Sequence, residues 1–304
     1  MRQRDAKLFY VVFQLYMGNT IITMAKYSID DMLDAIEEYQ ATHLPIVPPI
    51  KVALAKHEPA TRLRLSSLVE VLCGGHVNDK TTEEVLRHLQ PSAFVRWGYG
   101  MTEASDRVAI TACKRFSKTK AGCVGPLVSG MEAVVIDPMS KERLPPNKRG
   151  ELWVRGPNVI QDYFHNEEAT AATISQDGWL HTRDLVYFND DGELDIVGRL
   201  KDLIKYKGFQ VSPSELETIL LTHSEITDAA VVGFPDEYAG EIPVAFIVQA
   251  QGSSLTEVDA ITFVGDQIAP YKRVRKVRFV MKLPKMASGK VIRHELMHQA
   301  AAKL

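Results

Sequence analysis

Residues 191–217, DGELDIVGRLKDLIKYKGFQVSPSELE, join two structured regions of the chain. After an acidic turn, the alternating apolar run Leu194–Val197 predicts a strand, which Gly198-Arg199 ends. Further on, Ser212-Pro213-Ser214-Glu215 predicts the start of a helix, because a serine can cap the first turn and proline fits its first position.

A basic segment lies between the end of the predicted strand and the start of the predicted helix. Its one glycine, Gly208, allows the backbone to turn or to approach a ligand closely. A solvated basic connector between two domains is the simplest interpretation. A segment that contacts an anionic ligand is the alternative. The cationic side chains of this segment are Lys201, Lys205 and Lys207.

Length and composition bound the class of protein. A chain of 304 residues can bury a sizeable core and usually divides into two domains. A net charge of −2 gives no reason to expect a nucleic acid as partner. Cys73, Cys113 and Cys123 are widely spaced, which argues against a disulfide framework or a zinc site and favours a reducing compartment. The apolar run Phe9–Met17 is too short to span a membrane and lacks a signal-cleavage site.

The last three residues, Ala302-Lys303-Leu304, nearly match the Ser-Lys-Leu address that directs proteins to peroxisomes. This match predicts a peroxisomal protein that binds a peroxisomal import receptor through its C-terminus. The alternative is a helix that simply ends there, in a cytoplasmic protein.

Residues 1–100 alternate short apolar runs with helical patterns, and strands separated by helices predict βαβ units and a parallel sheet. The predicted strands are Asn19–Ala25, His43–Val47, Leu68–Leu72 and Ala93–Trp97, and the predicted helices are Ile29–Tyr39, with Asp30 near its cap, and Thr81–Leu89.

From about Lys118 the pattern changes to short strands joined by Gly, Pro and Asn turns, which predicts a small β-barrel or sandwich. The fold class is therefore α/β: part of a large parallel α/β domain with a small barrel or sandwich (residues 1–200), then a separate α+β domain (residues 201–304). The predicted strands of the middle part are Gly122–Gly125, Glu132–Ile136, Gly150–Arg155, Asp184–Phe188 and Glu193–Val197. In the last part they are Asp228–Gly233, Pro243–Gln249 and Arg275–Val280, with helices Ser214–Thr222, Thr256–Ile268 and Ile292–Lys303.

Three short motifs carry candidate chemistry. Residues 98–104, GYGMTEA, follow a strand end, where a hydroxyl and a carboxylate suit a phosphate with its magnesium; a turn that merely caps the next helix is the alternative. In residues 181–184, HTRD, the aspartate could accept both hydroxyls of a ribose or pair with Arg183 at the surface. Residues 284–290, PKMASGK, form a loop whose last lysine could neutralise charge at a phosphate or be an exposed turn lysine.

Together these stretches resemble the adenylate-forming acyl-CoA synthetase family, most closely its plant 4-coumarate:CoA ligase and ligase-like branch. The resemblance covers nearly the whole chain from about Gly18, and firefly-type luciferases and fatty-acyl-CoA synthetases share much of it. No single motif is specific, but the five stretches in this order are. The stretches are GYGMTEAS (98–105), GELWVRGPNVIQDYFHNEEAT (150–170), DGWLHTRD (177–184), GRLKDLIKYKGFQVSPSELE (198–217) and PKMASGKVIRHEL (284–296).

The resemblance implies a two-step reaction that uses ATP, Mg2+ and CoA. A small-molecule carboxylic acid attacks the α-phosphate of ATP, giving an acyl-adenylate and pyrophosphate, and the CoA thiol then displaces AMP. In such a site Tyr99 would stack on adenine beside Gly100, Thr102 would contact the α-phosphate, and Glu103 would hold the metal.

The resemblance also implies roles for residues further along the chain. Asp184 would bind the ribose hydroxyls with Arg199 nearby, and Lys290 would stabilise the transition state of adenylation. Lys201 would be the hinge between two domain positions. The remaining assignments are Lys205 as a catalytic residue that contacts the adenylate with Gln210, Gly208 and Lys207 for CoA, and Gly74, Gly75, Lys80 and Met101 for the acyl pocket.

The sequence departs from the family in several places. It holds no Ser/Thr/Gly-rich phosphate loop ending in lysine, and Phe9-Tyr10-Val11 stands near its start without the family's histidine. Residues 73–78, CGGHVN, replace a small-residue segment that lines the acyl and adenine pocket, Arg183 replaces a glycine, and Gly198 replaces a common aspartate. A parallel sheet without its leading strands exposes apolar edges, so we expect the first hundred residues to be less stable than the rest.

These observations leave alternative functions. The first is a 4-coumarate:CoA-ligase-like acid–thiol ligase, and within that class a peroxisomal fatty-acyl or oxylipin ligase competes with a hydroxycinnamate ligase. The second is a non-catalytic protein that binds adenylate, CoA or a partner, because losing donors around a transferring phosphate raises the barrier by several kcal/mol.

Overall fold

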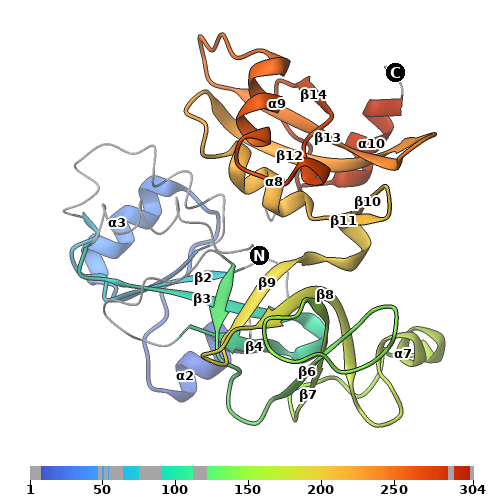
Figure 1. Cartoon of the computed structure of the whole chain (residues 1–304). Helices are drawn as coiled ribbons and strands as arrows, with labels where there is room; N and C mark the ends of the chain where they lie inside the picture. The colour runs from blue at the N-terminus through green and yellow to red at the C-terminus, as the bar shows by residue number, and fades with distance from the viewer. Residues whose placement is uncertain are drawn as a thin grey trace. The chain divides into compact units, whose positions relative to one another are not determined.

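The computed structural model of the chain describes residues 8–46, 50, 54, 64–74, 91–111, 122–286 and 291–301. The chain divides into two compact units, which Figure 1 shows as a cartoon. Unit 1 comprises Met1–Thr182 and Val186–Ile196, and unit 2 comprises Arg183–Leu185 and Val197–Leu304. Each unit has its own hydrophobic core.

Unit 1 contains a four-stranded sheet in which three of the four predicted parallel strands are confirmed. β1 pairs with β2 and β2 with β3 in parallel, and β4, which was not predicted, runs antiparallel to β3. Neighbouring parallel strands therefore end at the same edge of the sheet. The strands are β1 (His43–Ile46), β2 (Glu70–Gly74), β3 (Phe94–Met101) and β4 (Asp106–Ile110).

Helix α3 (Ile29–Tyr39) has its predicted bounds. Its apolar residues recur on one face and bury Met32, Leu33 and Ile36. Ser28 caps the helix, and Asp30 lies in the first turn, near the cap as predicted. Two short helical elements precede it, η1 (Leu8–Phe13) and α2 (Gln14–Tyr16).

The predicted strand Asn19–Ala25 is wrong. The segment has no regular secondary structure, and Ile22 and Met24 are 39% and 41% exposed. Apolar, β-branched composition alone does not make a strand when no neighbouring strand satisfies its backbone, and none in the described part of the chain pairs with it. The predicted helix Thr81–Leu89 lies outside the described residues.

The second sheet has the order β5-β9-β8-β7-β6. Its first and last strands do not pair in the described ranges, so this sheet is open and the predicted barrel does not close; β5 is short, which limits the stagger that closure needs. Val71 and Leu152, from the two sheets, share one core. The elements are β5 (Cys123–Gly125), β6 (Glu132–Ile136), β7 (Gly150–Arg155), α7 (Glu167–Thr173), β8 (Leu180–Phe188) and β9 (Leu194–Arg199).

Unit 2 is built on a further sheet, of order β11-β10-β13-β12, with β14 parallel to β13. Alternate residues of the β12–β13 pair enter different cores. The opposed pair Val231 and Ala245 packs with α8 and α9, and the next pair, Ala230 and Phe246, packs on the other face with Leu296 of α10. Helices therefore cover both faces of this strand pair.

The elements of unit 2 mostly match the predicted α+β pattern, with the β10–β11 hairpin as an addition. They are η3 (Leu200–Asp202), β10 (Ile204–Tyr206), β11 (Phe209–Val211), α8 (Pro213–Leu220), β12 (Ile226–Asp236), β13 (Gly240–Gln249), α9 (Glu257–Gly265), η4 (Pro270–Lys272), β14 (Lys276–Phe279) and α10 (Arg293–Ala301).

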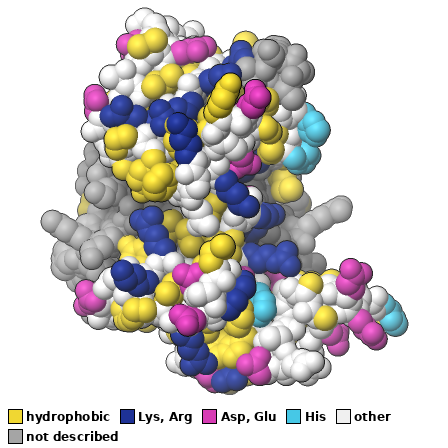
Figure 2. Space-filling model, turned by 45° about the vertical axis from the view of Figure 1, so that its right-hand side comes forward, with side chains coloured by type: hydrophobic (Ala, Val, Ile, Leu, Met, Phe, Trp, Pro, Cys, Tyr) yellow, Lys and Arg dark blue, Asp and Glu magenta, His cyan; other side chains and the backbone are white. Residues whose placement is uncertain are grey.

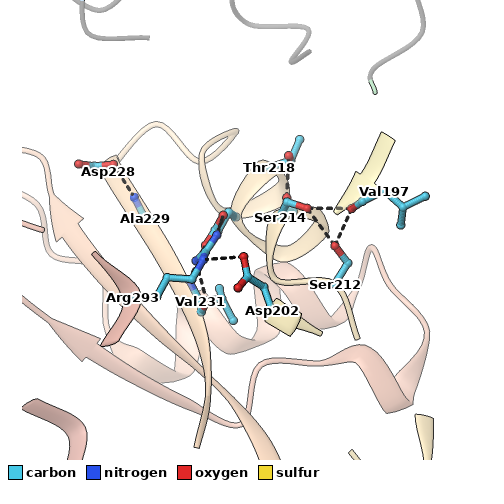
Figure 3. Close-up of polar contacts among 10 residues, drawn as sticks. Val197, Asp202, Ser212, Ser214, Thr218, Asp228, Ala229, Val231 and Arg293 are labelled. Atoms are coloured by element: carbon cyan, nitrogen blue, oxygen red, sulfur yellow. Dashed lines mark hydrogen bonds and ion pairs between the residues drawn. The ribbon is translucent and has the colours of Figure 1, made fainter. Parts of the chain in front are cut away.

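A buried ion pair links α8, β12 and α10. The Glu217 carboxylate, on a residue only 7% exposed, accepts hydrogen bonds from the Val231 amide at 2.8 Å and from Arg293. Figure 3 shows Arg293 directed toward Val231 and Asp202; it donates to the Val231 carbonyl at 3.0 Å and lies 3.8 Å from the Asp202 carboxylate. Burial alone would lower the pKa of Arg293, but the bond and charge of Glu217 and the charge of Asp202 raise it above its ordinary value.

Replacing Arg293 by methionine leaves the Glu217 carboxylate buried without its compensating cation. We expect the free energy of unfolding of unit 2 to fall by about 3 kcal/mol, measured from native-state hydrogen exchange of the β12 amides. Lys285→Met is the control, because Lys285 pairs with Asp228 through side chains that are 36% and 30% exposed, and such pairs contribute less than about 1 kcal/mol. Equal losses of protection in the two variants would contradict the expectation.

The thiol of Cys123 on β5 is buried, and its Sγ lies 3.5 Å from Glu193 Oε2. Burial, joined by the charges of Asp195 and Glu193, raises the pKa of this thiol to about 12, although a bond from the Gly125 backbone acts in the opposite direction. At pH 8 we therefore expect iodoacetamide to modify Cys123 about 10³-fold more slowly in the folded protein than in the urea-unfolded chain. Peptide mass spectrometry gives both rates, and similar rates would show that the thiol is not protected.

Candidate functional site

The end of β3 brings together the first group of predicted site residues. Thr102 and Glu103 begin the turn η2 (Thr102–Ala104), and Ser105, in a left-handed conformation with φ 49°, reverses the chain into β4. The Thr102 side chain is exposed and Glu103 is half-buried, so a ligand at this edge of the sheet can reach both. Tyr99 and Met101 are partly buried against the core, on either side of Gly100.

Two glycines that face each other make room for one arginine. Gly74 and Gly98 are register partners on β2 and β3. A Cβ atom on Gly98 would lie 1.8 Å from Arg107 Nη1, and one on Gly74 would lie 3.8 Å from the same atom. The Arg107 guanidinium therefore occupies the space beside these two glycines. Of the residues predicted for the acyl pocket, Gly74 and Met101 lie at the ends of β2 and β3, and Gly75 and Lys80 lie outside the described residues.

The segment Asn158–Tyr163 contacts this turn through three residues. Asn158 Nδ2 donates to the carbonyls of Ala104 and Arg107, both at 2.9 Å. The Ile160 amide donates to the carbonyl of Glu103, and the Tyr163 hydroxyl donates to Glu103 Oε1, both at 2.8 Å. Sequence reasoning gave this segment no role, since the Tyr163–Glu103 contact joins residues 60 positions apart.

A second carboxylate lies in unit 2. Asp184 is only 4% exposed, and its Oδ1 atom lies 3.1 Å from Nε of Arg199. The structure thus brings together the two residues expected at the ribose. Arg183 is exposed and has φ 58°, in the left-handed region that favours glycine, so its backbone rather than its bulk explains why glycine suits this position.

Two serine hydroxyls bind the backbone at Val197, just before the basic connector (residues 198–211) begins. The carbonyl of Val197 accepts hydrogen bonds from Ser212 Oγ at 2.8 Å and Ser214 Oγ at 2.9 Å, as Figure 3 shows. A Cβ atom on Gly198 would lie 3.0 Å from the Ser212 hydroxyl, so a larger residue here would require this side chain to shift slightly. Ser212 and Ser214 therefore link the start of α8 to Val197. The predicted cap is wrong at Ser212, which occupies the N-cap position of α8 but makes no side-chain capping hydrogen bond. The expected hinge residue, Lys201, is exposed in η3.

The β10–β11 hairpin carries four further predicted site residues. Lys207 and Gly208 form its two-residue turn with φ 47° and 82°, the positive values that a type I′ turn requires. Lys205 and Gln210 are register partners, so their exposed side chains leave the same face of the hairpin. Lys290 and Ala302-Lys303-Leu304 lie outside the described residues. Figure 2 shows Lys and Arg side chains distributed over the face that it presents.

Two kinds of feature are absent from the part of the chain that the structure describes. No group of three or more His, Cys, Asp and Glu side chains there is placed to hold a metal ion. No helix in the same ranges has the length and apolar character needed to cross a membrane.

Comparisons with known proteins identify the family. Residues 5–164 match the family model of AMP-binding enzymes, and residues 215–290 match that of the AMP-binding enzyme C-terminal domain. Among curated proteins, probable CoA ligase CCL5 of Humulus lupulus is 47% identical and peroxisomal OPC-8:0-CoA ligase 1 of Arabidopsis thaliana is 46% identical. Each alignment covers 95% of this chain and 53% of the relative, so the chain spans about half the length of these proteins.

Solved structures agree. ATP-bound MatB from Rhodopseudomonas palustris superposes with a TM-score of 0.86 at 28% identity, covering 97% of this chain and 58% of that one. The amide bond synthetase McbA from Marinactinospora thermotolerans gives a TM-score of 0.84 at 30% identity, covering 94% and 57%. With matches in sequence and in structure, the chain belongs to the AMP-binding enzyme family, and its curated relatives include CoA ligases and 4-coumarate–CoA ligase-like proteins.

Proposed function

We propose that the chain activates a small carboxylic acid with ATP and transfers the acyl group to CoA. The observation that supports this most strongly is the half-buried Glu103 beside the exposed Thr102 at the carboxyl end of parallel strand β3. Ligands of open α/β sheets bind at this edge, and a hydroxyl and a carboxylate suit a metal-bound phosphate. Two relatives in sequence are named as CoA ligases, which agrees with this reaction.

The reaction has two steps. A carboxylate oxygen of the acid attacks the α-phosphorus of ATP, an acyl–oxygen–phosphorus bond forms, and the bond to the β-phosphate breaks to release pyrophosphate. The CoA thiolate then attacks the acyl carbonyl carbon and AMP leaves. Lys290 stabilises the negative charge of the first step, and Lys205 and Gln210, paired on one hairpin face, contact the adenylate.

The other residues bind and orient the substrates. Tyr99 stacks on the adenine beside Gly100, and Asp184, oriented by Arg199, accepts the ribose hydroxyls. Gly208 and Lys207, at the hairpin turn, contact CoA, and Lys201 is the pivot between the two half-reactions. Gly74, Gly75, Lys80 and Met101 belong to the acyl pocket.

The donor set fits Mg2+. This ion takes hard oxygen ligands and is usually held by one or two carboxylates with substrate phosphates and water, rather than by a cage of protein groups. Glu103 supplies one such carboxylate, and one of its oxygens already has a protein donor in Tyr163. Bound there, Mg2+ would neutralise charge on the phosphates of ATP.

A second candidate function is nucleotide binding without turnover. The sequence contains no Ser/Thr/Gly-rich loop ending in lysine, so donors that would surround the β- and γ-phosphates are not identified in it. Binding of AMP without formation of acyl-CoA would support this candidate.

Acid-dependent formation of AMP and acyl-CoA tests the proposal, with hydroxycinnamic and fatty acids as substrates. We expect Lys290→Ala to lower the rate of adenylation by about 10²- to 10³-fold, because it removes a preorganised cation from the transferring phosphate. Lys285→Ala is the matched control from the same loop, since Lys285 is paired with Asp228. Equal rates in the two variants would contradict the role of Lys290, and a folded chain that binds AMP but does not turn over would favour the second candidate.

The acid is either a hydroxycinnamate or a fatty-acyl or oxylipin acid, and the peroxisome is the proposed location, with the cytoplasm as the alternative. The name of one relative, peroxisomal OPC-8:0-CoA ligase 1, and the terminal Ala302-Lys303-Leu304 support the peroxisome.

A fluorescent protein fused to the N-terminus of the chain tests this location in plant cells. We expect puncta that coincide with a peroxisomal marker, and diffuse fluorescence after deletion of the last three residues, because the import receptor reads the extreme C-terminus. Diffuse fluorescence of both fusions would favour the cytoplasm.

A further inference from the structure

A side chain outside the roles above contacts the proposed metal ligand. The Tyr163 hydroxyl donates to Glu103 Oε1 at 2.8 Å, and both residues are half-buried. An ionised carboxylate can only accept hydrogen bonds, and a neutral phenol supplies one donor. The contact therefore occupies Oε1 of Glu103. The second oxygen of the same carboxylate, Oε2, takes no part in this contact.

The contact is not needed to hold the two segments together. The Asn158 amide already bridges two carbonyls of the 103–107 turn, and the Ile160 amide binds a third. The backbone of Tyr163 is fixed from its own side as well. Its amide donates to Thr170 Oγ1 at 2.9 Å, and its carbonyl accepts from Asn166 at 3.0 Å. The phenol hydroxyl is thus an extra bond, directed at a side chain and not at the backbone.

A carboxylate on a long side chain rotates freely about its last torsion unless a neighbour selects one orientation. Orientation matters for Mg2+, which demands near-ideal octahedral geometry, and partners that hydrogen-bond to a ligating carboxylate tune its affinity for metal. Tyr163 has the geometry to select the orientation of Glu103, because its hydroxyl bonds to one carboxylate oxygen and its backbone is fixed by the bonds to Thr170 and Asn166.

We propose that Tyr163 is a positioning residue that orients the Glu103 carboxylate so that Oε2 is presented to the divalent cation of the nucleotide. This inference rests on the proposed function, since it assumes that Glu103 is the metal ligand. It predicts that the hydroxyl of Tyr163 affects metal-dependent binding of nucleotide and leaves metal-independent binding unchanged.

Calorimetric titration of the full chain with MgATP, and separately with AMP in the presence of EDTA, tests the proposal. Tyr163→Phe removes only the hydroxyl, and we expect the Kd for MgATP to rise by about 10-fold while the Kd for AMP stays unchanged. Tyr187→Phe is the matched control, because Tyr187 on β8 of the same unit also hydrogen-bonds to a carboxylate, that of Asp195. This control variant should bind both nucleotides like the wild type.

A double-mutant cycle makes the test specific. In the Glu103→Gln background, Tyr163→Phe should have no further effect on MgATP binding, because the group that it orients is gone. An unchanged Kd for MgATP in Tyr163→Phe, or equal weakening of MgATP and AMP, would overturn the positioning role and leave the proposed function standing. Failure of the wild type to bind either nucleotide would overturn both.

Discussion

The buried carboxylate of Glu217 is the constraint on which unit 2 depends. A charge at this depth is tolerated only when it is paired and fully hydrogen-bonded, and its partners come from β12 and α10, on two other parts of the chain. α8 therefore cannot shift without breaking the Arg293 contact. Its first turn also holds the connector, through Ser212 and Ser214 on the Val197 carbonyl. The Glu217–Arg293 ion pair thus fixes α8, and the first turn of α8 in turn holds the backbone at Val197.

In unit 1, the environment of Glu103 differs from that of Glu217. This carboxylate is only half-buried, at a strand end, and a distant segment supplies hydrogen bonds to its backbone and to one of its oxygens. A carboxylate held in place but still accessible is suited to binding, whereas the enclosed Glu217 is suited to structure. Asp184 is intermediate: it is as buried as Glu217, but its Arg199 partner is 40% exposed at the side chain. Burial and pairing separate these roles better than residue type does.

Local signals in the sequence were sufficient for much of the fold. The helix Ile29–Tyr39 and the strands Glu132–Ile136 and Gly150–Arg155 have the predicted bounds, because their hydrophobic periodicity and their turn residues agree. The strand expected at Asn19–Ala25 failed, since a strand needs a partner that composition does not reveal. In the site, motif residues such as Glu103 and Asp184 could be selected from sequence. Arg199 was expected beside Asp184 from the family resemblance, but Tyr163, the partner of Glu103, was not expected, because its contact joins distant segments and spacing along the chain does not encode such contacts.

The alternation of the β12–β13 pair has a consequence for how this unit can change in evolution. Val231 and Ala230 face different cores, so a single-residue insertion within either strand would exchange the residues that face α8 and α9 with those that face α10. Both cores would be disrupted by one event. Changes in length are therefore expected only in the turn between Asp236 and Gly240, where the two strands end.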